Sequence, residues 1–177
     1  TNFIFTIKDQ WYEELKKLDM LSLYNEIELP LTTILADMER EGVLVNQDIL
    51  DSIQKELEIK LEEIEQQIHY LAGKTFNISS PLQLGKILFD ELKLPYHKAK
   101  KDDKYKTDVK VLHQLIDAHP IVKLVLTYRN IAKILGTYVV GLKSFISADG
   151  KVHTIYNQAL TRTGRLSSIE PNMQNIP

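Results

Sequence analysis

Three side chains in the second half of the chain have the types and spacing needed to bind phosphate. Arg129, Lys133 and Thr137 follow one another at intervals of four residues, so in a helix they share one face. Cationic and hydroxyl side chains donate hydrogen bonds to phosphate oxygens, which gives affinity for a nucleic-acid backbone without reading its sequence. The spacing therefore predicts a helix face that contacts phosphate.

A second cationic feature is the stretch of residues 96–108. Its lysines are Lys98, Lys100, Lys101, Lys104 and Lys106. The stretch contains few aliphatic residues, so we expect an exposed loop. Two interpretations stay open: contact with phosphate, and an ordinary solvated surface loop, which charge runs usually form.

Charge is distributed unevenly along the 177-residue chain, whose formal net charge is −2. Residues 1–92 carry 8 basic and 18 acidic side chains, whereas residues 93–177 carry 14 basic and 6 acidic ones. A basic second half indicates a polyanionic partner, but mutual attraction between the two halves would explain the same asymmetry.

Side chains for bond-making chemistry are not grouped in the sequence. Two-metal phosphoryl transfer needs carboxylates that hold two ions about 3.5–4 Å apart. Most carboxylates here lie on an acidic helix surface, and Asp149 and Glu170 are isolated. The histidines lack zinc-site spacing, and the chain has no P-loop, nucleophile elbow or dinucleotide-binding motif. We therefore expect no catalytic residue, metal ligand or cofactor in this chain.

Composition also bears on location. The chain has no cysteine, which excludes disulfides and fits a cytoplasmic protein, although many secreted proteins also lack cysteine. No apolar run reaches the roughly 18 residues of a membrane span. The N-terminus has neither a basic start nor an initiator methionine, so we interpret it as a cut within a longer chain rather than a signal peptide.

The apolar pattern predicts a mainly α-helical fold built on a long antiparallel helix pair. Apolar residues recur at three- and four-residue steps over residues 48–71, and as a heptad seam over residues 121–146. The two stripes should pack together, with a short helix after Ser80 at their tip. If both stripes are buried, replacing Leu61 or Leu135 by alanine should cost about 2–5 kcal/mol. A plain helical bundle or a dimeric coiled coil would show the same pattern.

Shorter elements surround this pair. A helix is expected over residues 8–23, and a second one starts near Pro30 and stops at Gly42. Residues 43–45 form an extended link, and residues 152–160 alternate as a β-strand does. We thus expect one or two short strands near the C-terminus.

Two motifs resemble segments of bacterial, polymerase I-like A-family DNA polymerases. Thr161-Arg162-Thr163-Gly164-Arg165-Leu166-Ser167-Ser168, with Pro171-Asn172-Met173-Gln174-Asn175-Ile176-Pro177, resembles the family segment TGRLSS…PNLQNIP. Residues 76–92 are similar to the FN…S…QL…LF motif of the polymerase thumb, and Gly136-Thr137-Tyr138 looks like part of the second long thumb helix. The resemblance covers about residues 20–177.

The resemblance implies a division into subdomains. Residues 1–19 would be the tail of a 3′–5′ exonuclease-type domain, residues 20–147 the thumb, and residues 148–177 the beginning of the palm. In the family the thumb holds primer–template duplex DNA, while the palm carboxylates that bind Mg²⁺ and the fingers helix that binds deoxynucleotides come later in the chain. We therefore expect a monomeric fragment that grips DNA and catalyses nothing alone. The last dozen residues are expected to be disordered, because the palm sheet that receives them is absent.

The resemblance also assigns DNA contacts. Arg165 matches a family arginine at the minor groove of the primer end, and Asn172, Gln174 and Asn175 match polar residues that contact template or primer nearby. These side chains suit the minor groove, where all base pairs present acceptors at equivalent positions. The alternative for Arg165 is a salt bridge to Glu170.

Two further contacts are implied at the thumb tip, where Lys104 and Thr107 match a lysine and a threonine near the DNA backbone. Here the sequence departs from the family pattern. Asp102-Asp103 replaces its glycine-containing part and Asp108 follows, which weakens the case for tight phosphate contact. The competing hypothesis for the whole chain is a helical protein-interaction module that binds no nucleic acid.

Overall fold

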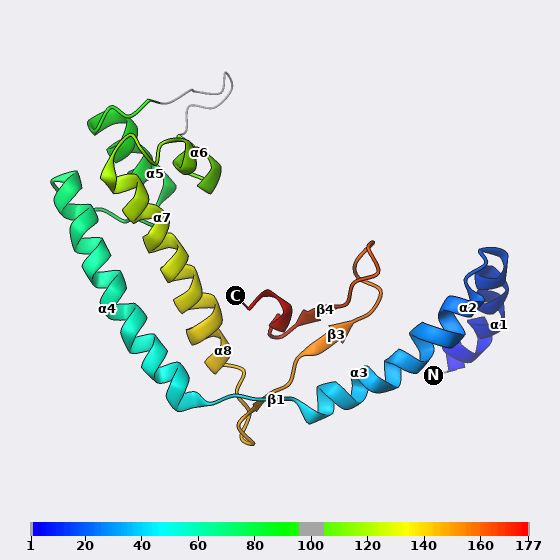
Figure 1. The fold of residues 1–177 in the computed structure, drawn as a ribbon. Coiled ribbons are helices and arrows are strands. Elements are labelled where there is room, and N and C mark those ends of the chain that lie inside the picture. The colour runs from blue at the N-terminus through cyan, green and yellow to red at the C-terminus, as the bar shows by residue number, and fades with distance from the viewer. Residues whose placement is uncertain (1, 96–104, 177) are drawn as a thin grey trace. The chain divides into compact units, whose positions relative to one another are not determined.

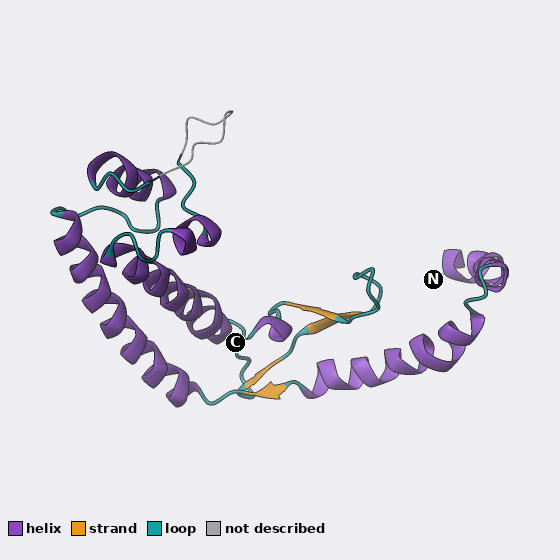
Figure 2. Ribbon diagram, turned by 45° about the horizontal axis from the view of Figure 1, so that its top comes forward, coloured by secondary structure: helices purple, strands orange, loops and turns teal. Residues whose placement is uncertain are grey.

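The chain is mainly α-helical, with a few short antiparallel strands (Figure 2). A computed structural model describes residues 2–95 and 105–176, so Lys104 and most of the lysine-rich stretch lie outside the described residues. The described residues form two units: the first within Thr1–Val45 and Phe145–Pro177, the second within Asn46–Ser144. The predicted fold class is confirmed.

The second unit contains the predicted helix pair. Its elements are α4 (Gln47–Ala72), α5 (Pro81–Gly85), a π-helical stretch (Lys86–Glu91), α6 (Val109–Gln114), α7 (Pro120–Lys133), a second π-helical stretch (Ile134–Val140) and α8 (Gly141–Lys143). Helix α7 continues through the π-helical stretch into α8 and runs antiparallel to α4 (Figure 1). Lys143 at one end contacts the Asp51 carboxylate, and its Nζ lies 2.6 Å from Oε1 of Gln54 near the start of α4.

Capping side chains explain where helices of the second unit begin. Asn46 Oδ1 accepts a hydrogen bond from the backbone N–H of Ile49 at 3.1 Å, and the Asp108 carboxylate accepts one from that of Val111 at 3.0 Å. Each cap satisfies a donor that the first turn of a helix leaves unpaired. The Asp108 carboxylate, whose negative charge argued against phosphate contact by this loop, therefore caps the first turn of α6.

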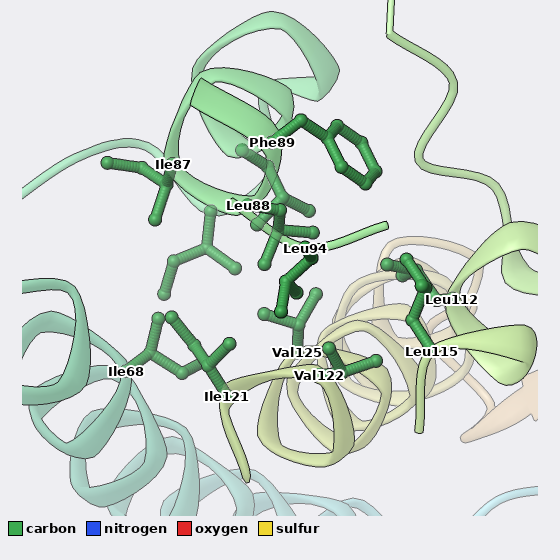
Figure 3. Packing of buried hydrophobic residues seen from close by; sticks show 12 residues of the cluster. Ile68, Ile87, Leu88, Phe89, Leu94, Leu112, Leu115, Ile121, Val122 and Val125 are labelled. Carbon is green, nitrogen blue, oxygen red and sulfur yellow. The ribbon is translucent and has the colours of Figure 1, made fainter. Parts of the chain in front are cut away.

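The buried core of the second unit lies at the tip, where short helices cover the ends of the long pair (Figure 3). Its members are apolar and almost inaccessible to water: Ile68, Ile78, Leu84, Ile87, Leu88, Phe89, Leu94, Leu112, Leu115, Ile121, Val122 and Val125. Along the seam itself, Leu57, Leu61 and Leu135 are only half-buried. Two helices side by side leave both flanks of their contact open to solvent, whereas the tip is closed by a further layer.

The first unit is built from helices and two small sheets. Its elements are α1 (Asn2–Lys17), α2 (Leu21–Leu23), a π-helical stretch (Tyr24–Glu28), α3 (Leu29–Glu41), β1 (Val43–Leu44), β2 (Lys151–Val152), β3 (Ile155–Asn157), β4 (Ser167–Ile169) and a 3₁₀ helix (Met173–Asn175). Strand β1 pairs with β2 and β3 pairs with β4, both antiparallel. Residues 20–45 therefore group with the C-terminal segment, and the subdomain boundaries implied by the resemblance stay predictions.

One of the two helices predicted in the first unit has different boundaries. Helix α1 ends at Lys17 rather than at residue 23, because Asp19 has a left-handed backbone with φ of 55°. The second helix begins as predicted: α3 starts at Leu29 with Pro30 in its first turn and is capped by Gly42, although it follows α2 and the π-helical stretch without a break. The Glu28 carbonyl at the end of the π-helical stretch accepts hydrogen bonds from side chains, including Gln158 Nε2 at 3.0 Å.

The predicted strand over residues 152–160 is two strands with different partners. Between β2 and β3, the side chains of His153 and Thr154 are anchored elsewhere. His153 Nδ1 lies 2.8 Å from the Glu39 carbonyl oxygen at the end of α3, and its Nε2 lies 3.3 Å from Oδ2 of Asp149. The Glu39 carbonyl, followed by the Asp149 carboxylate, raises the pKa of His153. These anchors redirect the chain from one sheet to the other.

Two other segments of the first unit have pairing partners that the sequence did not indicate. Residues 43–45 were predicted as an extended link, and Val43 and Leu44 form β1, which pairs with Val152 and Lys151. The last dozen residues were expected to be disordered, but those up to residue 176 are ordered: β4 pairs with β3, and the 3₁₀ helix follows it. The local hairpin supplies the pairing partner for this segment.

Candidate nucleic-acid interface

The helix face predicted to contact phosphate belongs to the second unit. Lys133 ends α7 and Thr137 lies in the π-helical continuation; both side chains are exposed. Lys133 forms no ion pair with another residue that the structure describes. Tyr128 and Tyr138, which lie on the heptad seam of residues 121–146, are half-buried. Desolvation, with a smaller effect of Glu65, raises the pKa of Tyr128.

Arg129 and Thr107 bind each other. The Arg129 guanidinium donates to the backbone carbonyl of Thr107 and to its hydroxyl oxygen at 3.2 Å. Thr107 is only 4% exposed, and burial lowers the pKa of Arg129, which stays charged near neutral pH. The pair ties the chain entering α6 to α7. Contact of Arg129, Thr107 or Lys104 with DNA stays a prediction.

Arg165 lies on the connection between β3 and β4 in the first unit. The pairing of Asn157 with Ser167 closes the hairpin, and the Thr161 hydroxyl donates to the Arg165 carbonyl at 2.5 Å. The Arg165 side chain is exposed and has no ion pair among residues 2–95 and 105–176. The salt bridge to Glu170, the alternative for this arginine, is therefore not formed, and its guanidinium faces solvent.

The three amide side chains predicted to contact DNA follow β4. Asn172 precedes the 3₁₀ helix, Gln174 and Asn175 lie within it, and all three side chains are exposed. Asn172 caps this helix, since its Oδ1 accepts a hydrogen bond from the Gln174 backbone N–H at 3.1 Å. The structure thus brings these amides together on one short turn.

Two buried hydroxyls that support this turn were not among the predicted site residues. Ser168 is fully buried, and its Oγ accepts a hydrogen bond from the Met173 backbone N–H at 2.9 Å. Thr154 is 3% exposed and its Oγ1 lies 2.9 Å from the Ile169 carbonyl oxygen. Serine and threonine in a polar run carry no sequence signal of burial, so only the fold reveals them.

Possible metal ligands are few. Within the described residues, no group of three or more His, Asp and Glu side chains is placed to hold a metal ion. The Asp149 carboxylate accepts a hydrogen bond from the backbone N–H of Lys151 at 3.1 Å and also contacts His153. The hydrogen bond from Lys151 is the largest cause of the lowered pKa of Asp149. These side chains do not fit the magnesium site of a polymerase. Of the described helices, none has both the length and the apolar character required to cross a membrane.

The motifs, the fold and known proteins agree on the class of the chain. It belongs to DNA polymerase family A, whose profile matches residues 47–177. It is 48% identical over 175 residues to DNA polymerase I of Bacillus subtilis strain 168, an alignment that covers 98% of this chain and 20% of that protein. It is 49% identical over 166 residues to DNA polymerase I of Streptococcus pneumoniae TIGR4, covering 93% of this chain and 19% of that protein. The chain therefore spans about a fifth of the length of these relatives.

A solved structure supports the same class. The POL domain of Pol1 from M. smegmatis, in complex with DNA primer-template and dNTP, matches the fold with a TM-score of 0.85 and 39% sequence identity. The match covers 93% of this chain and 29% of that domain's chain. At 39% identity, the similarity supports membership of the same family as well as a shared fold.

Proposed function

We propose that this chain is the part of a DNA-directed DNA polymerase that grips primer–template duplex DNA. Residues 20–147 serve as the thumb and residues 148–177 as the start of the palm, with residues 1–19 belonging to an exonuclease-type domain. The observation that carries the proposal is the match to a Pol1 POL domain in complex with DNA primer-template and dNTP. The chain acts as a monomer in the cytoplasm, as part of a longer bacterial polymerase.

Two kinds of DNA contact contribute to this grip, one to backbone phosphates and one to the minor groove. Lys133 and Thr137 donate to backbone phosphates, which gives affinity for any sequence. Arg165 and the amides of Asn172, Gln174 and Asn175 donate to the acceptors that every base pair presents in the minor groove. Support for this comes from the exposure of all these side chains and from the absence of an ion pair at Lys133 and Arg165 among the described residues. Arg129 and Thr107, which bind each other, hold the thumb tip in place beside the backbone.

Nucleotide incorporation needs polypeptide beyond these residues. In a longer polymerase, palm carboxylates would hold Mg²⁺, which neutralises charge on the transferred phosphate and activates the primer hydroxyl. This chain contributes the duplex grip and binds no deoxynucleotide. Purified chain should therefore give no primer extension above a mock control with Mg²⁺ and dNTPs present, and extension above that control would refute this part of the proposal.

The grip is tested by fluorescence anisotropy with a labelled primer–template hairpin. Affinity should fall steeply between about 50 and 200 mM salt, because binding releases counterions from phosphates. Lys133→Gln should reduce the slope of log affinity against log salt by about one. Arg165→Ala should weaken binding by about tenfold.

Arg162→Ala is the matched control, because Arg162 is an exposed arginine of the same connection and the charge change is identical. Its loss should be much smaller than that of Arg165→Ala. Equal losses of affinity in the two variants would mean that Arg165 contributes only its positive charge and makes no specific contact. Salt-insensitive binding, or no binding in low salt, would reject the proposal itself.

The second candidate is a protein-interaction module, and one observation favours it. A groove of about 740 Å³ runs between α4 and α7 and includes Tyr70, Leu71 and Leu124. Docking of an apolar helix there would persist at high salt, whereas phosphate-driven binding would not. Absence of DNA binding together with salt-resistant capture of an amphipathic helical peptide would favour this candidate.

A further inference from the structure

We propose that Thr154 and Ser168 are positioning residues whose buried hydroxyls hold the turn of residues 170–175 and orient the Asn172 amide with its N–H donors outward. The inference rests on the proposed function, because that function makes this turn a minor-groove contact. Neither hydroxyl touches DNA; each acts through the backbone or the side chain that it binds.

Thr154 clamps the chain on both sides of Glu170. Its Oγ1 lies 2.9 Å from the Ile169 carbonyl oxygen and 2.8 Å from the Pro171 carbonyl oxygen, so one hydroxyl proton serves two acceptors. Glu170 between them has φ of 56°, a left-handed backbone that a residue with a Cβ rarely adopts. A buried donor that bridges the flanking carbonyls stabilises this bend, which starts the turn.

Ser168 fixes the other end of the turn through a chain of hydrogen bonds. Its fully buried Oγ accepts from the Met173 backbone N–H at 2.9 Å, and its own proton points to Asn172 Oδ1 at 3.4 Å. The same Oδ1 accepts from the Gln174 backbone N–H at 3.1 Å. Two donors therefore converge on the oxygen of the Asn172 amide.

This convergence decides which way the amide faces. An asparagine amide has one acceptor oxygen and one NH₂ donor group, and the hydrogen-bond network determines which of them turns inward. With Oδ1 held inward by Ser168 and Gln174, Nδ2 is the atom presented to solvent. The minor groove offers acceptors at equivalent positions of every base pair, so an outward donor can bind any sequence, whereas an outward oxygen would be repelled.

Removing either hydroxyl takes hydrogen-bond partners from backbone groups of this partly buried turn. In Ser168→Ala the Met173 N–H loses its acceptor and Asn172 loses one of the two donors that orient it. In Thr154→Val two carbonyls lose their shared donor, with little change in side-chain volume. Losing these hydrogen bonds at a partly buried site is unfavourable, so the turn should loosen until water pairs with the freed groups. Thr154→Ser keeps the hydroxyl and serves as the conservative control.

The test uses the whole chain and two readouts. The first needs no DNA: amide hydrogen exchange at Met173, followed by NMR, should accelerate at least about tenfold in Ser168→Ala while far-UV circular dichroism is unchanged. The second is affinity for the labelled primer–template hairpin. Ser168→Ala and Thr154→Val should each weaken binding about fivefold to tenfold, the range expected for one lost hydrogen bond. The salt slope should match wild type, because no phosphate contact is removed. Thr154→Ser should stay within about twofold of wild type.

The outcomes separate this inference from the proposed function. If Asn172→Ala weakens duplex binding but Ser168→Ala and Thr154→Val bind as wild type does, the positioning role is overturned. If the wild-type chain does not bind the hairpin, the proposed function fails, and the exchange rate at Met173 still decides whether Ser168 holds the turn. An unchanged exchange rate at Met173 in Ser168→Ala would show that Ser168 does not hold the turn, whatever the DNA result. A smaller salt slope in Ser168→Ala or Thr154→Val would show that the substitution disturbed a phosphate contact instead.

Discussion

Leu88→Ala should destabilise the second unit more than Leu61→Ala, although both leucines lie on helical apolar stripes. Leu88 is completely buried in the tip cluster, where truncation removes its transfer free energy and leaves a cavity, at a cost of about 2–5 kcal/mol. Leu61 is only half-buried on the seam, so part of its surface already meets water in the folded state. The neighbouring solvent can fill the space, and we expect about 1–2 kcal/mol there, below the range that full burial of the seam would give.

Urea unfolding provides the assay. Far-UV circular dichroism follows the helices, and fluorescence of Trp11, the single tryptophan, follows the first unit separately. Leu88→Ala should shift the circular dichroism midpoint at least twice as far as Leu61→Ala, with an unchanged slope. Equal shifts would mean that the seam is as closely packed as the tip, and that the location assigned to the core is wrong.

Three further predictions concern contacts that the fold creates. Gly42→Ala should destabilise the first unit by about 1–3 kcal/mol, because Gly42 has φ of 69° and an added Cβ would lie 2.6 Å from the His153 ring; a Trp11 midpoint equal to wild type would contradict this. Arg129→Met should lower the free energy of unfolding of the second unit by about 1–3 kcal/mol, because it leaves the buried Thr107 carbonyl without its charged donor. Arg129→Lys should restore little of this stability, because a lysine ammonium cannot bind the carbonyl and the hydroxyl with the geometry of a guanidinium. The raised pKa of His153 stabilises the fold below its unfolded pKa of about 6.5, and that contribution is lost as pH rises through the folded pKa. The difference in Trp11 midpoint between wild type and His153→Gln should therefore shrink from about pH 6 to pH 9, and a constant difference would refute the charged interaction.

Local patterns were sufficient for the helices and for the family. Stripes with three- and four-residue steps predicted the antiparallel pair because a long helix must bury one face, whatever covers it. Ser80 and Gly42 marked helix ends because capping depends on the side chain and backbone of a single residue. The motif ending at residue 177 indicated the family because it is long and rich in polar residues that have no packing reason to occur together. Errors arose where distant residues intervene, as when His153 and Thr154 divide one expected strand into two.

What the sequence by itself determined was therefore the helical pair and the class of protein, and it supplied the set of side chains that we predict to contact DNA. Tertiary structure decided which of those side chains remain available. Arg129 and Lys133 look equivalent in the sequence, yet the first is tied to Thr107 and the second is exposed. Likewise, Ser168 is one serine among several until the hairpin buries it beneath Asn172. Burial and hydrogen-bond partners depend on residues far apart in the chain, so no local pattern encodes them.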